Sequence, residues 1–311
     1  MSKIRLALIA GGKSDEREVS LNGAAGVEKE LDVDKYDVVR YDPATDLEAI
    51  AHDAESIDVA FVLLHGLFGE DGTIQGFLDL LDIPYQGAGV LGSALAMNKN
   101  LAKILYRLNG LPVAPWVMAD KEDKDAPQRI TEQLKVPYVV KPVKQGSSIG
   151  MTIVREEKAL PEALELAFKH DDEVMVEEYI QGREVTVGVI GNDNLLALPL
   201  VEIIPDSRFD FFDYEAKYMA GASEEICPAK VSEAIRDKAQ AYAITAHRTL
   251  QLRGYSRTDM IVNEDGIFVL ETNTIPGMTP TSLLPQAAAE AGLLFPQLLD
   301  KLIELAMEGR R

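Results

Sequence analysis

The sequence predicts a Rossmann-like α/β domain with a parallel sheet at the N-terminus, followed by α+β segments built on antiparallel sheets. Within residues 4–81, short apolar runs alternate with helical segments, which is typical of a parallel sheet covered by helices. From residue 138 onward, strand-like runs follow one another through short joins, and such joins connect antiparallel strands. These two patterns indicate two kinds of sheet in one chain.

The composition is that of a soluble globular chain with two or three domains, since 47% of the 311 residues are hydrophobic and 26% are charged. The formal charge of −20 argues against nucleic acid and anionic membranes as partners. The single cysteine, Cys227, excludes an internal disulfide and a cysteine zinc site. Because no apolar run suits a signal peptide or a membrane span, we expect a cytoplasmic protein.

The expected elements of the N-terminal domain alternate regularly along the chain. They are strands at 4–10, 36–41 and 59–64, and helices at 19–31, 47–54 and 73–81. Glu16 and His65 each lie just past the carboxyl end of one of these strands. Ligands of such sheets bind at that edge, so both side chains are candidates for ligand binding.

Two glycine-rich runs resemble nucleotide-binding loops without meeting the requirements of these loops. The run 12–14 (GKS) resembles the end of a P-loop, but Ala7 stands where the first glycine is needed. The run 87–92 matches G-x-G-x-x-G, but a poor strand precedes it and no acidic residue follows at 107–111 to hold a ribose. We interpret it as a turn that starts a helix.

The middle of the chain combines lysines with a Gly-Ser loop. A helix at about 93–108 contains Lys99 and Lys103, and a strand at 138–141 ends in Lys141. The loop 142–150 follows, and then come a strand at 151–154 and a helix at 160–170. Such a loop after a lysine can cover a polyphosphate with its amides and hydroxyls, although many Gly-Ser loops are simple hairpin turns.

Residues 205–223 form a long aromatic segment without apolar periodicity. This indicates an active-site lid or, alternatively, a surface excursion packed by its own aromatic side chains. Strands are expected before it, at 173–180, 184–190 and 195–204, and helices after it, at 231–252 and 295–307.

The segment 257–283 contains a clear β-hairpin signal, because apolar runs flank the turn residues 263–266. A three-residue loop ending in a left-handed Gly266 would place Asp259 opposite Glu271. A two-residue Asp-Gly turn would instead place these carboxylates on opposite faces of the hairpin. The register therefore decides what they can do.

If they share a face, Asp259, Glu271 and Asn273 offer three hard oxygen donors, which suit Mg²⁺ or Mn²⁺ completed by phosphate and water. The alternative is a solvated hairpin with polar ends. The constrained loop 274–282 follows, with a free Gly277 amide and several hydroxyls. Such loops ahead of a helix bind oxyanions or carboxylates.

The order of these features resembles the D-alanine–D-alanine ligases of the ATP-grasp superfamily, over essentially the whole chain. The most specific motifs are 16–20 (EREVS), 64–66 (LHG), 213–218 (DYEAKY) and 273–279 (NTIPGMT). The resemblance implies three domains. They are a substrate-binding domain at 1–98, a central ATP-grasp subdomain at 99–182, and a C-terminal ATP-grasp subdomain with the metal and substrate site at 183–311.

The resemblance also implies a reaction that serves peptidoglycan synthesis. ATP phosphorylates the carboxylate of one D-alanine, the amine of a second D-alanine attacks the acyl phosphate, and ADP, phosphate and the dipeptide leave. Two Mg²⁺ or Mn²⁺ ions and a homodimer are implied as well. The nearest alternative is another ATP-grasp carboxylate–amine ligase that uses D-lactate, D-serine or an unrelated acid. An ATP-binding regulatory module and a Rossmann dehydrogenase are alternatives from other classes.

For the nucleotide, the resemblance implies binding by Lys99, Lys141, Ser147, Ser148, Glu177, Glu178, Ile180, Glu184 and Lys217. The lysines at 99 and 141 neutralise the α- and β-phosphates, and the serine loop closes over the γ-phosphate. Glu177 faces the adenine edge, with hydrogen bonds from the neighbouring strand backbone, and Glu184 accepts from the ribose. The implied metal ligands are Asp259, Glu271 and Asn273.

For the reaction, the implied catalytic residues are Glu16, Ser147, Tyr218, Arg257 and Gly277, and the implied substrate-binding residues are Glu16, His65, Lys217, Ser282 and Leu283. Glu16 binds the first ammonium group and joins Ser147 and Tyr218 in a hydrogen-bond chain. Arg257 and the Gly277 amide form an oxyanion hole. The Ser282 hydroxyl and the Leu283 amide bind the second carboxylate, while Lys217 contacts the transferring phosphate and His65 lies near the reacting groups.

Overall fold

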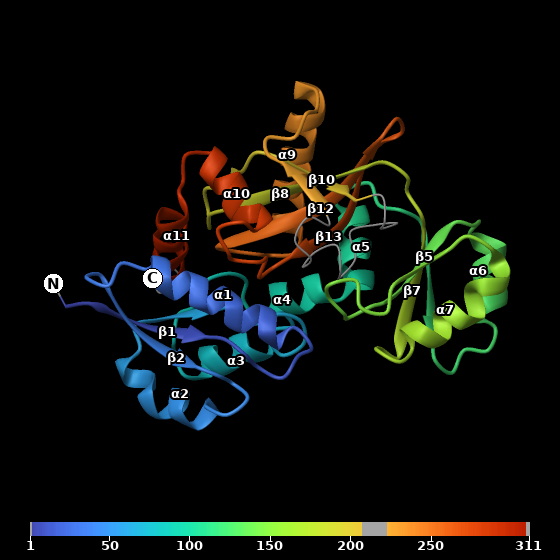
Figure 1. Ribbon diagram of the computed structural model, residues 1–311. Helices are drawn as coiled ribbons and strands as arrows, with labels where there is room; N and C mark the ends of the chain where they lie inside the picture. The colour runs from blue at the N-terminus through green and yellow to red at the C-terminus, as the bar shows by residue number, and fades with distance from the viewer. Residues whose placement is uncertain (1, 207–222, 309–311) are drawn as a thin grey trace.

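The computed structural model describes residues 2–206 and 223–308 and arranges them around three sheets (Figure 1). A parallel sheet forms the N-terminal part, and a four-stranded and a six-stranded antiparallel sheet follow. Within the described ranges, no helix is both long and apolar enough to cross a membrane. The predicted succession of an α/β domain and α+β segments is confirmed.

The N-terminal sheet has the strand order β2-β1-β3 with parallel pairing. Its elements are β1 (Ile4–Ile9), α1 (Arg17–Glu30), β2 (Tyr36–Tyr41), α2 (Leu47–Asp53), a 3₁₀ turn (Ala54–Ser56), β3 (Val59–Val62) and α3 (Thr73–Leu80). A single parallel bridge between Ala60 and Tyr85 attaches the run before Gly87, which looked like a poor strand, to β3. All of β3 and most of β1 are buried, which explains their continuous apolar runs.

One expected helix is in fact two helices. The sequence predicted a helix at 93–108, but α4 (Val90–Met97) ends and α5 (Lys99–Leu108) begins at Asn98. Asn98 has an extended backbone, and its side-chain oxygen accepts a hydrogen bond from the Leu101 amide at 3.0 Å. Asparagine is a strong N-cap, so it starts a new helix where the apolar pattern alone would continue the old one.

The glycine run 87–92 is the turn that starts α4, as predicted. Its last glycine serves packing, because a Cβ on Gly92 would lie 2.9 Å from Leu252 Cδ2 and 3.1 Å from two backbone carbonyl oxygens. The glycine run therefore lets α4 pack closely against the segment 250–252.

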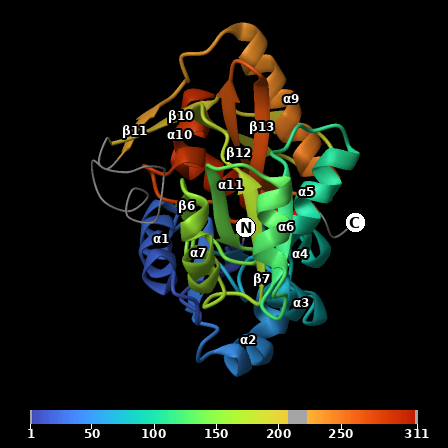
Figure 2. The same cartoon turned by 90° about the vertical axis from the view of Figure 1, so that its right-hand side faces the viewer.

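The four-stranded sheet has the order β4-β7-β5-β6 and lies to the right in Figure 1. Its elements are β4 (Trp116–Asp120), α6 (Ala126–Gln133), β5 (Tyr138–Pro142), β6 (Thr152–Val154), a 3₁₀ turn (Glu157–Ala159), α7 (Leu160–Ala167) and β7 (Glu173–Glu178). Figure 2 shows this part from its own side, with α6 and α7 toward the viewer. The sequence pattern did not predict β4 and α6, and α6 buries only Ala126 and Ile130, which is too little for a clear apolar period.

The six-stranded sheet has the order β11-β10-β8-β12-β13, and β9 also pairs with β8. Its strands are β8 (Arg183–Ile190), β9 (Leu196–Ala197), β10 (Val201–Pro205), β11 (Ser223–Ile226), β12 (Tyr255–Asn263) and β13 (Gly266–Asn273). The strands β7 and β8 are consecutive in the chain but belong to different sheets.

In the described residues of this part, three helices follow: α9 (Glu233–Thr249), α10 (Leu283–Glu290) and α11 (Phe295–Glu308). The helix α9 shares a buried cluster with β8 and β12. The helices α10 and α11 share another cluster with the N-terminal sheet. The core therefore continues from the first domain into the last (Figure 1).

Side-chain alternation along two strands positions the candidate site. The odd-numbered valines at 185–189 of β8 are buried in the cluster with α9. Between them, Glu184 and Thr186 face the other side of the sheet, as do Asp259 and Ile261 of β12. One face of the sheet thus packs on α9, while the other carries polar groups at the cleft and packs on α10 beside them.

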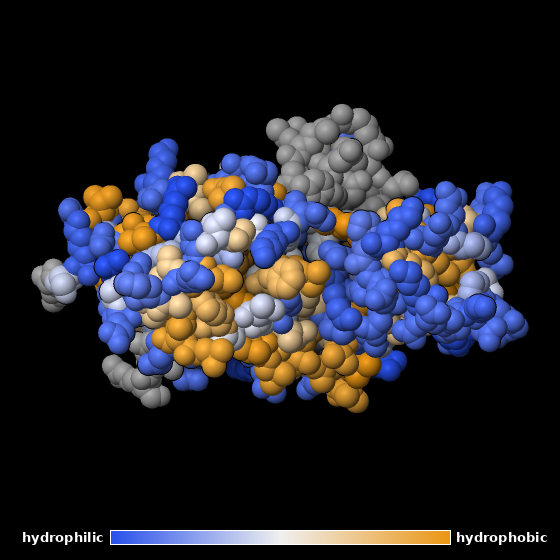
Figure 3. Space-filling view, turned by 90° about the horizontal axis from the view of Figure 1, so that it is seen from below, coloured by the Kyte–Doolittle hydropathy of each residue, from blue (hydrophilic) through white to orange (hydrophobic). Residues whose placement is uncertain are grey.

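The polarity of the surface differs between the two ends of the molecule. Figure 3 shows apolar side chains on the left and in the middle of one face, and mainly hydrophilic side chains over the four-stranded sheet at the right. Exposed apolar side chains of α3 and α4 include Leu80, which is 88% exposed, Val90 and Leu91. The first domain therefore carries exposed apolar surface.

Candidate active site

A cleft between the two antiparallel sheets contains most of the predicted nucleotide residues. Its walls come from β5, β6 and the loop between them, from the end of β7, and from β8, β12 and β13. The predicted residues that line it are Lys99, Lys141, Ser147, Ser148, Glu177, Glu178, Ile180, Glu184, Asp259 and Glu271. Lys217 and Tyr218 lie outside the described residues.

The hairpin of β12 and β13 has a two-residue turn at Glu264 and Asp265, which is neither the three-residue loop nor the Asp-Gly turn that the sequence left open. Asn263 pairs with Gly266, and this register continues to the pair of Met260 and Val269. The Asn263 side chain accepts from the amides of Asp265 and Gly266 at 2.9 and 3.2 Å. This Asx-type bonding supports the tighter turn, which pattern and composition alone did not reveal.

A bulge farther along the hairpin restores the predicted pairing. Leu270 is an extra residue in β13, and beyond it Asp259 pairs with Glu271 and Arg257 with Asn273. A one-residue shift moves every following side chain to the other face of a strand. The two-residue turn alone would have separated the carboxylates, and the bulge brings them to one face.

Among the described residues, three neighbours hold the carboxylate of Asp259, a residue that is 7% exposed. Arg257 donates from Nε and Nη2 at 2.9 and 2.8 Å, Thr186 donates from Oγ1 at 2.6 Å, and Asn273 donates from Nδ2 at 2.9 Å. Burial works against the charge of Arg257, but Asp259 outweighs it and raises the pKa of the guanidinium. The pair is therefore charged and fixed in orientation at neutral pH.

The oxygen donors at this strand end fit a divalent cation that arrives with phosphate. Asp259 pairs with Glu271, and Glu271 Oε2 lies 3.7 Å from Lys99 Nζ. In the described part of the chain, no group of three or more His, Cys, Asp and Glu side chains could hold a metal ion. The protein thus offers two carboxylates and the Asn273 amide, which suits Mg²⁺ or Mn²⁺ sharing its ligands with a nucleotide.

Lysine side chains approach the cleft from α5 and β5. Lys99 Nζ donates to the carbonyl oxygen of Gln145, at the start of the Gly-Ser loop. Lys141 and Lys103 both donate to Glu177, one to each carboxylate oxygen. Two cations therefore hold the carboxylate that we expected beside adenine.

The loop after β5 reaches the N-terminal domain. Ser147 Oγ donates to Glu16 Oε1, and a Cβ on Gly146 would lie 3.2 Å from Glu16 Oε2. Ser147 and Ser148 have φ of +49° and +59°, a left-handed conformation that is unfavourable for non-glycine residues. Such strain persists where the surroundings enforce it and is common at ligand clamps. The predicted Glu16–Ser147 contact is present, and its continuation to Tyr218 lies outside the described residues.

If the expected ligase reaction takes place here, replacing Ser147 by Ala should lower kcat/KM for D-alanine by roughly tenfold to a hundredfold, the equivalent of one hydrogen bond to a charged acceptor. The hydroxyl donates to the buried Glu16 carboxylate. Steady-state kinetics checks this result, with the exposed Ser56→Ala as the control that changes nothing. An unchanged kcat/KM in Ser147→Ala would mean that the contact does not hold the loop for the reaction.

His65 and Glu70 connect the N-terminal domain to the loop 274–282. Glu70 accepts from the amides of Gly66 at 2.9 Å and Ile275 at 3.3 Å, and the His65 imidazole donates to the backbone of Ile275. Burial lowers the pKa of His65, although Glu16 acts in the opposite direction. Burial, with help from Glu16, raises the pKa of Glu70 to about 8. Both groups are therefore mainly uncharged at neutral pH.

The loop before α10 brings together a hydroxyl and a helix N-terminus that could hold an anion. A Cβ on Gly277 would lie 3.1 Å from Ser282 Oγ, and the Thr279 amide donates to the same oxygen at 3.1 Å. Ser282 is the N-cap of α10, and Leu283 is its first residue. The first amides of a helix have no acceptor within it, so the Leu283 amide is suited to a carboxylate.

Residues 105–304 match the family described as D-ala D-ala ligase C-terminus, and residues 42–88 match D-ala D-ala ligase N-terminus. The D-alanine–D-alanine ligase of Syntrophobacter fumaroxidans is 57% identical over 306 residues, which is 98% of each chain. The chain belongs to the D-alanine–D-alanine ligase family. The ligase of Desulfotalea psychrophila is 59% identical over 308 residues, or 98% of this chain and 96% of its own.

Solved structures of ligases share the fold. The D-Ala:D-Ser ligase VanG from Enterococcus faecalis has a TM-score of 0.87 and 35% identity, covering 98% of this chain and 100% of its own. The D-alanine–D-alanine ligase from Bacillus anthracis in complex with ATP has a TM-score of 0.85 and 32% identity, covering 99% and 98%. The three sheets are thus the arrangement of the D-alanine–D-alanine ligase family, with the ATP-grasp fold.

The sequence alone assigned no function to some of the side chains at this ligase site. Lys103 follows Lys99 by four residues on a predicted helix, and this spacing places both on one face. Glu70 belongs to the Gly-rich loop after β3, where ligands of parallel sheets bind. Thr186 had no signal of its own, because only the pairing of β8 with β12 brings it to Asp259.

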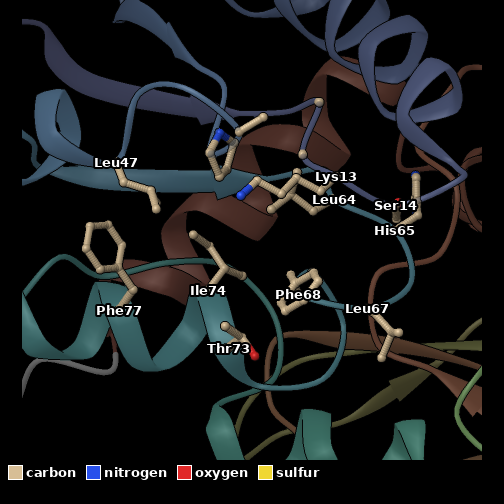
Figure 4. A pocket seen from close by; sticks show the side chains of 15 residues that line it. Lys13, Ser14, Leu47, Leu64, His65, Leu67, Phe68, Thr73, Ile74 and Phe77 are labelled. Carbon is tan, nitrogen blue, oxygen red and sulfur yellow. The ribbon is translucent and has the colours of Figure 1, made fainter.

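A second, mainly apolar pocket lies in the first domain of this ligase-family chain (Figure 4). The loop 11–14 and His65 border it, together with apolar side chains that include Leu64, Ile74 and Phe77. The Gly11 and Gly12 amides donate to Ser20 and Asp42 at 2.8 and 2.9 Å. These amides are thus already used within the protein, which explains why the GKS run is not a phosphate loop.

Proposed function

We propose that this chain is an ATP-dependent ligase that joins two D-alanine molecules to D-alanyl-D-alanine and releases ADP and phosphate. The convergence of Lys99, Lys141 and the Ser147 loop with the Asp259–Glu271 pair on one cleft carries this proposal. Phosphoryl transfer needs cationic and amide donors around the phosphates and ligands for a divalent ion beside them. Relatives that are 57% and 59% identical are named D-alanine–D-alanine ligases, which supplies the substrate.

The reaction consists of two displacements. First, a carboxylate oxygen of one D-alanine bonds to the γ-phosphorus of ATP while the bond to the bridging oxygen breaks, and ADP leaves. Second, the amine nitrogen of the other D-alanine bonds to the carbonyl carbon, and phosphate leaves with the former carboxylate oxygen. The incoming ammonium group gives up two protons on its way to the amide.

For the nucleotide, we assign the α- and β-phosphates to Lys99 and Lys141, and the γ-phosphate to the loop with Ser147 and Ser148. Glu177 faces the amino edge of adenine, with the backbone at Glu178 and Ile180 beside it, and Glu184 accepts from the ribose. The support is that all these residues line the same cleft. Lys217 stays a prediction for the transferring phosphate.

We assign Mg²⁺ or Mn²⁺ to Asp259, Glu271 and Asn273, and two ions are expected from the resemblance. These residues would hold a divalent cation, which would supply charge neutralisation at the transferring phosphoryl group. The chain itself orients the donors, because Arg257 and Thr186 hold Asp259 and the Leu270 bulge turns Glu271 to the same face.

For the first D-alanine, we assign the ammonium group to Glu16, with the neutral His65 nearby. The contact of Glu16 with Ser147 supports this role, since it closes the phosphate loop over the same place. We assign stabilisation of the tetrahedral oxyanion to Arg257 and the Gly277 amide. Tyr218 stays a prediction as the last member of the hydrogen-bond chain.

The second D-alanine places its carboxylate on the Ser282 hydroxyl and the Leu283 amide. Support comes from the position of both groups at the start of α10, beside Gly277. The proposed donor and acceptor sites are then adjacent, as amide formation requires.

Further features of the chain stay proposals. The Asn98 break and the separation of β7 from β8 support domains at 1–98, 99–182 and 183–311. A homodimer and a place in the cytoplasm are expected from the resemblance and from the composition. The strong negative charge supports the absence of a nucleic-acid partner.

The test is a product assay with ATP, Mg²⁺ and D-alanine, and with D-serine or D-lactate added in competition. We expect D-alanyl-D-alanine as the main product by mass spectrometry, and phosphate release that requires both Mg²⁺ and D-alanine. Phosphate release without any amino acid would contradict the proposal. D-alanyl-D-serine as the main product would instead indicate the activity named for the similar Enterococcus faecalis structure.

A further inference from the structure

Glu177 lies between two lysines with different surroundings. Lys141 donates to Oε1 and Lys103 donates to Oε2. Lys141 and Glu177 line the cleft, with side chains 10% and 5% exposed. The Lys103 side chain is 1% exposed and is absent from the cleft lining among the described residues. A molecule in the cleft can therefore contact Lys141 and Glu177, whereas Lys103 lies behind them.

The surroundings of Lys103 hold its ammonium group in place. Its Nζ lies 5.5 Å from the centre of the Trp116 ring, and Trp116 pairs directly with Glu177 across β4 and β7. Trp116 Nε1 donates to Asn100 Oδ1 at 2.9 Å, which ties β4 to α5. Lys103 and Glu177 are thus both held by packing around Trp116, which leaves little room for Lys103 to change its partner.

The buried Glu177 carboxylate needs a cation beside it at all times. Burial opposes the ionisation of Glu177, but Lys103 and Lys141 outweigh it and lower the pKa of Glu177 to about 2. Burial lowers the pKa of Lys103, and Glu177 acts against this effect. A buried carboxylate that loses its only cation is strongly destabilising. If Lys141 is to serve a phosphate, another cation must stay with Glu177.

We propose that Lys103 is a positioning residue, the permanent counter-ion of Glu177 that allows Lys141 to turn from Glu177 to the phosphates when ATP binds. This inference rests on the proposed function, because it takes the cleft as the ATP site. Lys141 then exchanges one anion for another, and Glu177 remains paired and oriented toward the purine. In a chain without Lys103, ATP and Glu177 compete for the single ammonium group of Lys141.

The first test is Lys103→Met, which keeps most of the volume and removes the charge. We expect KM for ATP to rise by on the order of a hundredfold, in line with the loss of a buried ion pair. KM for D-alanine should stay within about twofold, because its site does not involve Glu177. An unchanged KM for ATP, or an equal loss for both substrates, would overturn the inference.

The second test is the double variant Lys103→Met/Glu177→Gln, because a neutral amide in place of the Glu177 carboxylate no longer holds Lys141. We expect this double variant to have a KM for ATP about tenfold lower than Lys103→Met alone, although it carries one more change. A double variant no better than the single one would contradict the role of Lys103. If Lys103→Met alone does not fold, the double variant is compared with Glu177→Gln. Equal KM values for ATP then support the inference, and a further large loss overturns it.

Two more variants complete the experiment. Lys121→Met is the control, since Lys121 pairs with Asp172 at 3.6 Å just after β4, is 56% exposed and does not line the cleft, and it should leave all constants unchanged. Lys141→Met tests the proposed function itself. If it leaves KM for ATP unchanged, the cleft is not the ATP site. If it raises KM for ATP and Lys103→Met does not, only the role of Lys103 fails.

Discussion

Replacing Glu271 by Gln is expected to lower kcat by on the order of a thousandfold or more, equivalent to about 4 kcal/mol of transition-state stabilisation. Glu271 supplies one of the two carboxylates at the proposed metal site, and Gln keeps its shape without its charge. The Leu270 bulge and the pairing with Asp259 need only the backbone, so the hairpin should stay intact. The loss should therefore fall on phosphoryl transfer.

Steady-state kinetics over a range of Mg²⁺ concentrations checks this expectation. Glu271→Gln should need more Mg²⁺ for half-maximal activity, because the charge that attracts the ion is reduced. Glu264→Gln is the matched control, since Glu264 is exposed in the turn of the same hairpin and should behave like the unchanged protein. A Glu271→Gln variant with normal kcat and normal Mg²⁺ dependence would remove Glu271 from the metal site.

Replacing Arg257 by Met is expected to lower dipeptide formation by roughly a hundredfold to a thousandfold, the usual effect of losing an oxyanion-hole donor. Arg257 is part-buried near the start of β12, with its side chain 13% exposed, and directs two nitrogens to Asp259. Its loss also leaves Asp259 with less positive charge nearby, so unfolding free energy should fall by about 3 kcal/mol. Both effects follow from one side chain that serves the oxyanion and the carboxylate.

Hydroxylamine separates the two displacements, because it captures the acyl phosphate as a hydroxamate. If Arg257 serves the tetrahedral intermediate, Arg257→Met should lose much more dipeptide formation than hydroxamate formation. An equal loss of both would assign Arg257 to phosphoryl transfer instead. Arg183→Met is the control, since Arg183 makes a similar forked pair with Glu202 at 2.6 Å on the same sheet but is 45% exposed. It should leave both rates unchanged.

Sequence pattern was sufficient for the longer elements and failed where a single side chain decides the backbone. The strands of the first domain and the hairpin of β12 and β13 follow from their apolar runs. The break at Asn98 did not, because an N-cap competes with a helical pattern that continues on both sides. The turn at Asn263 did not either, because its side-chain hydrogen bonds favour two residues over three.

Some contacts of the candidate site could likewise be predicted from the sequence, and others could not. The Glu16–Ser147 contact and the Asp259–Glu271 pairing were expected before the structure, and both are present. Lys103 had no assigned role, because its partner Glu177 lies 74 residues farther along the chain. Long-range contacts of this kind depend on how elements pack, and a single sequence without relatives contains no direct signal for them.

By itself, the sequence determined most of the strands and helices, which motifs carry lysines, carboxylates and a serine loop, and which family they resemble. Tertiary structure decided how those groups act together. The Leu270 bulge placed Glu271 beside Asp259, the meeting of two sheets made the cleft, and the packing of α5 behind β7 put Lys103 on Glu177. The physical reason is that local pattern follows from neighbours in the chain, whereas register and burial depend on segments far away.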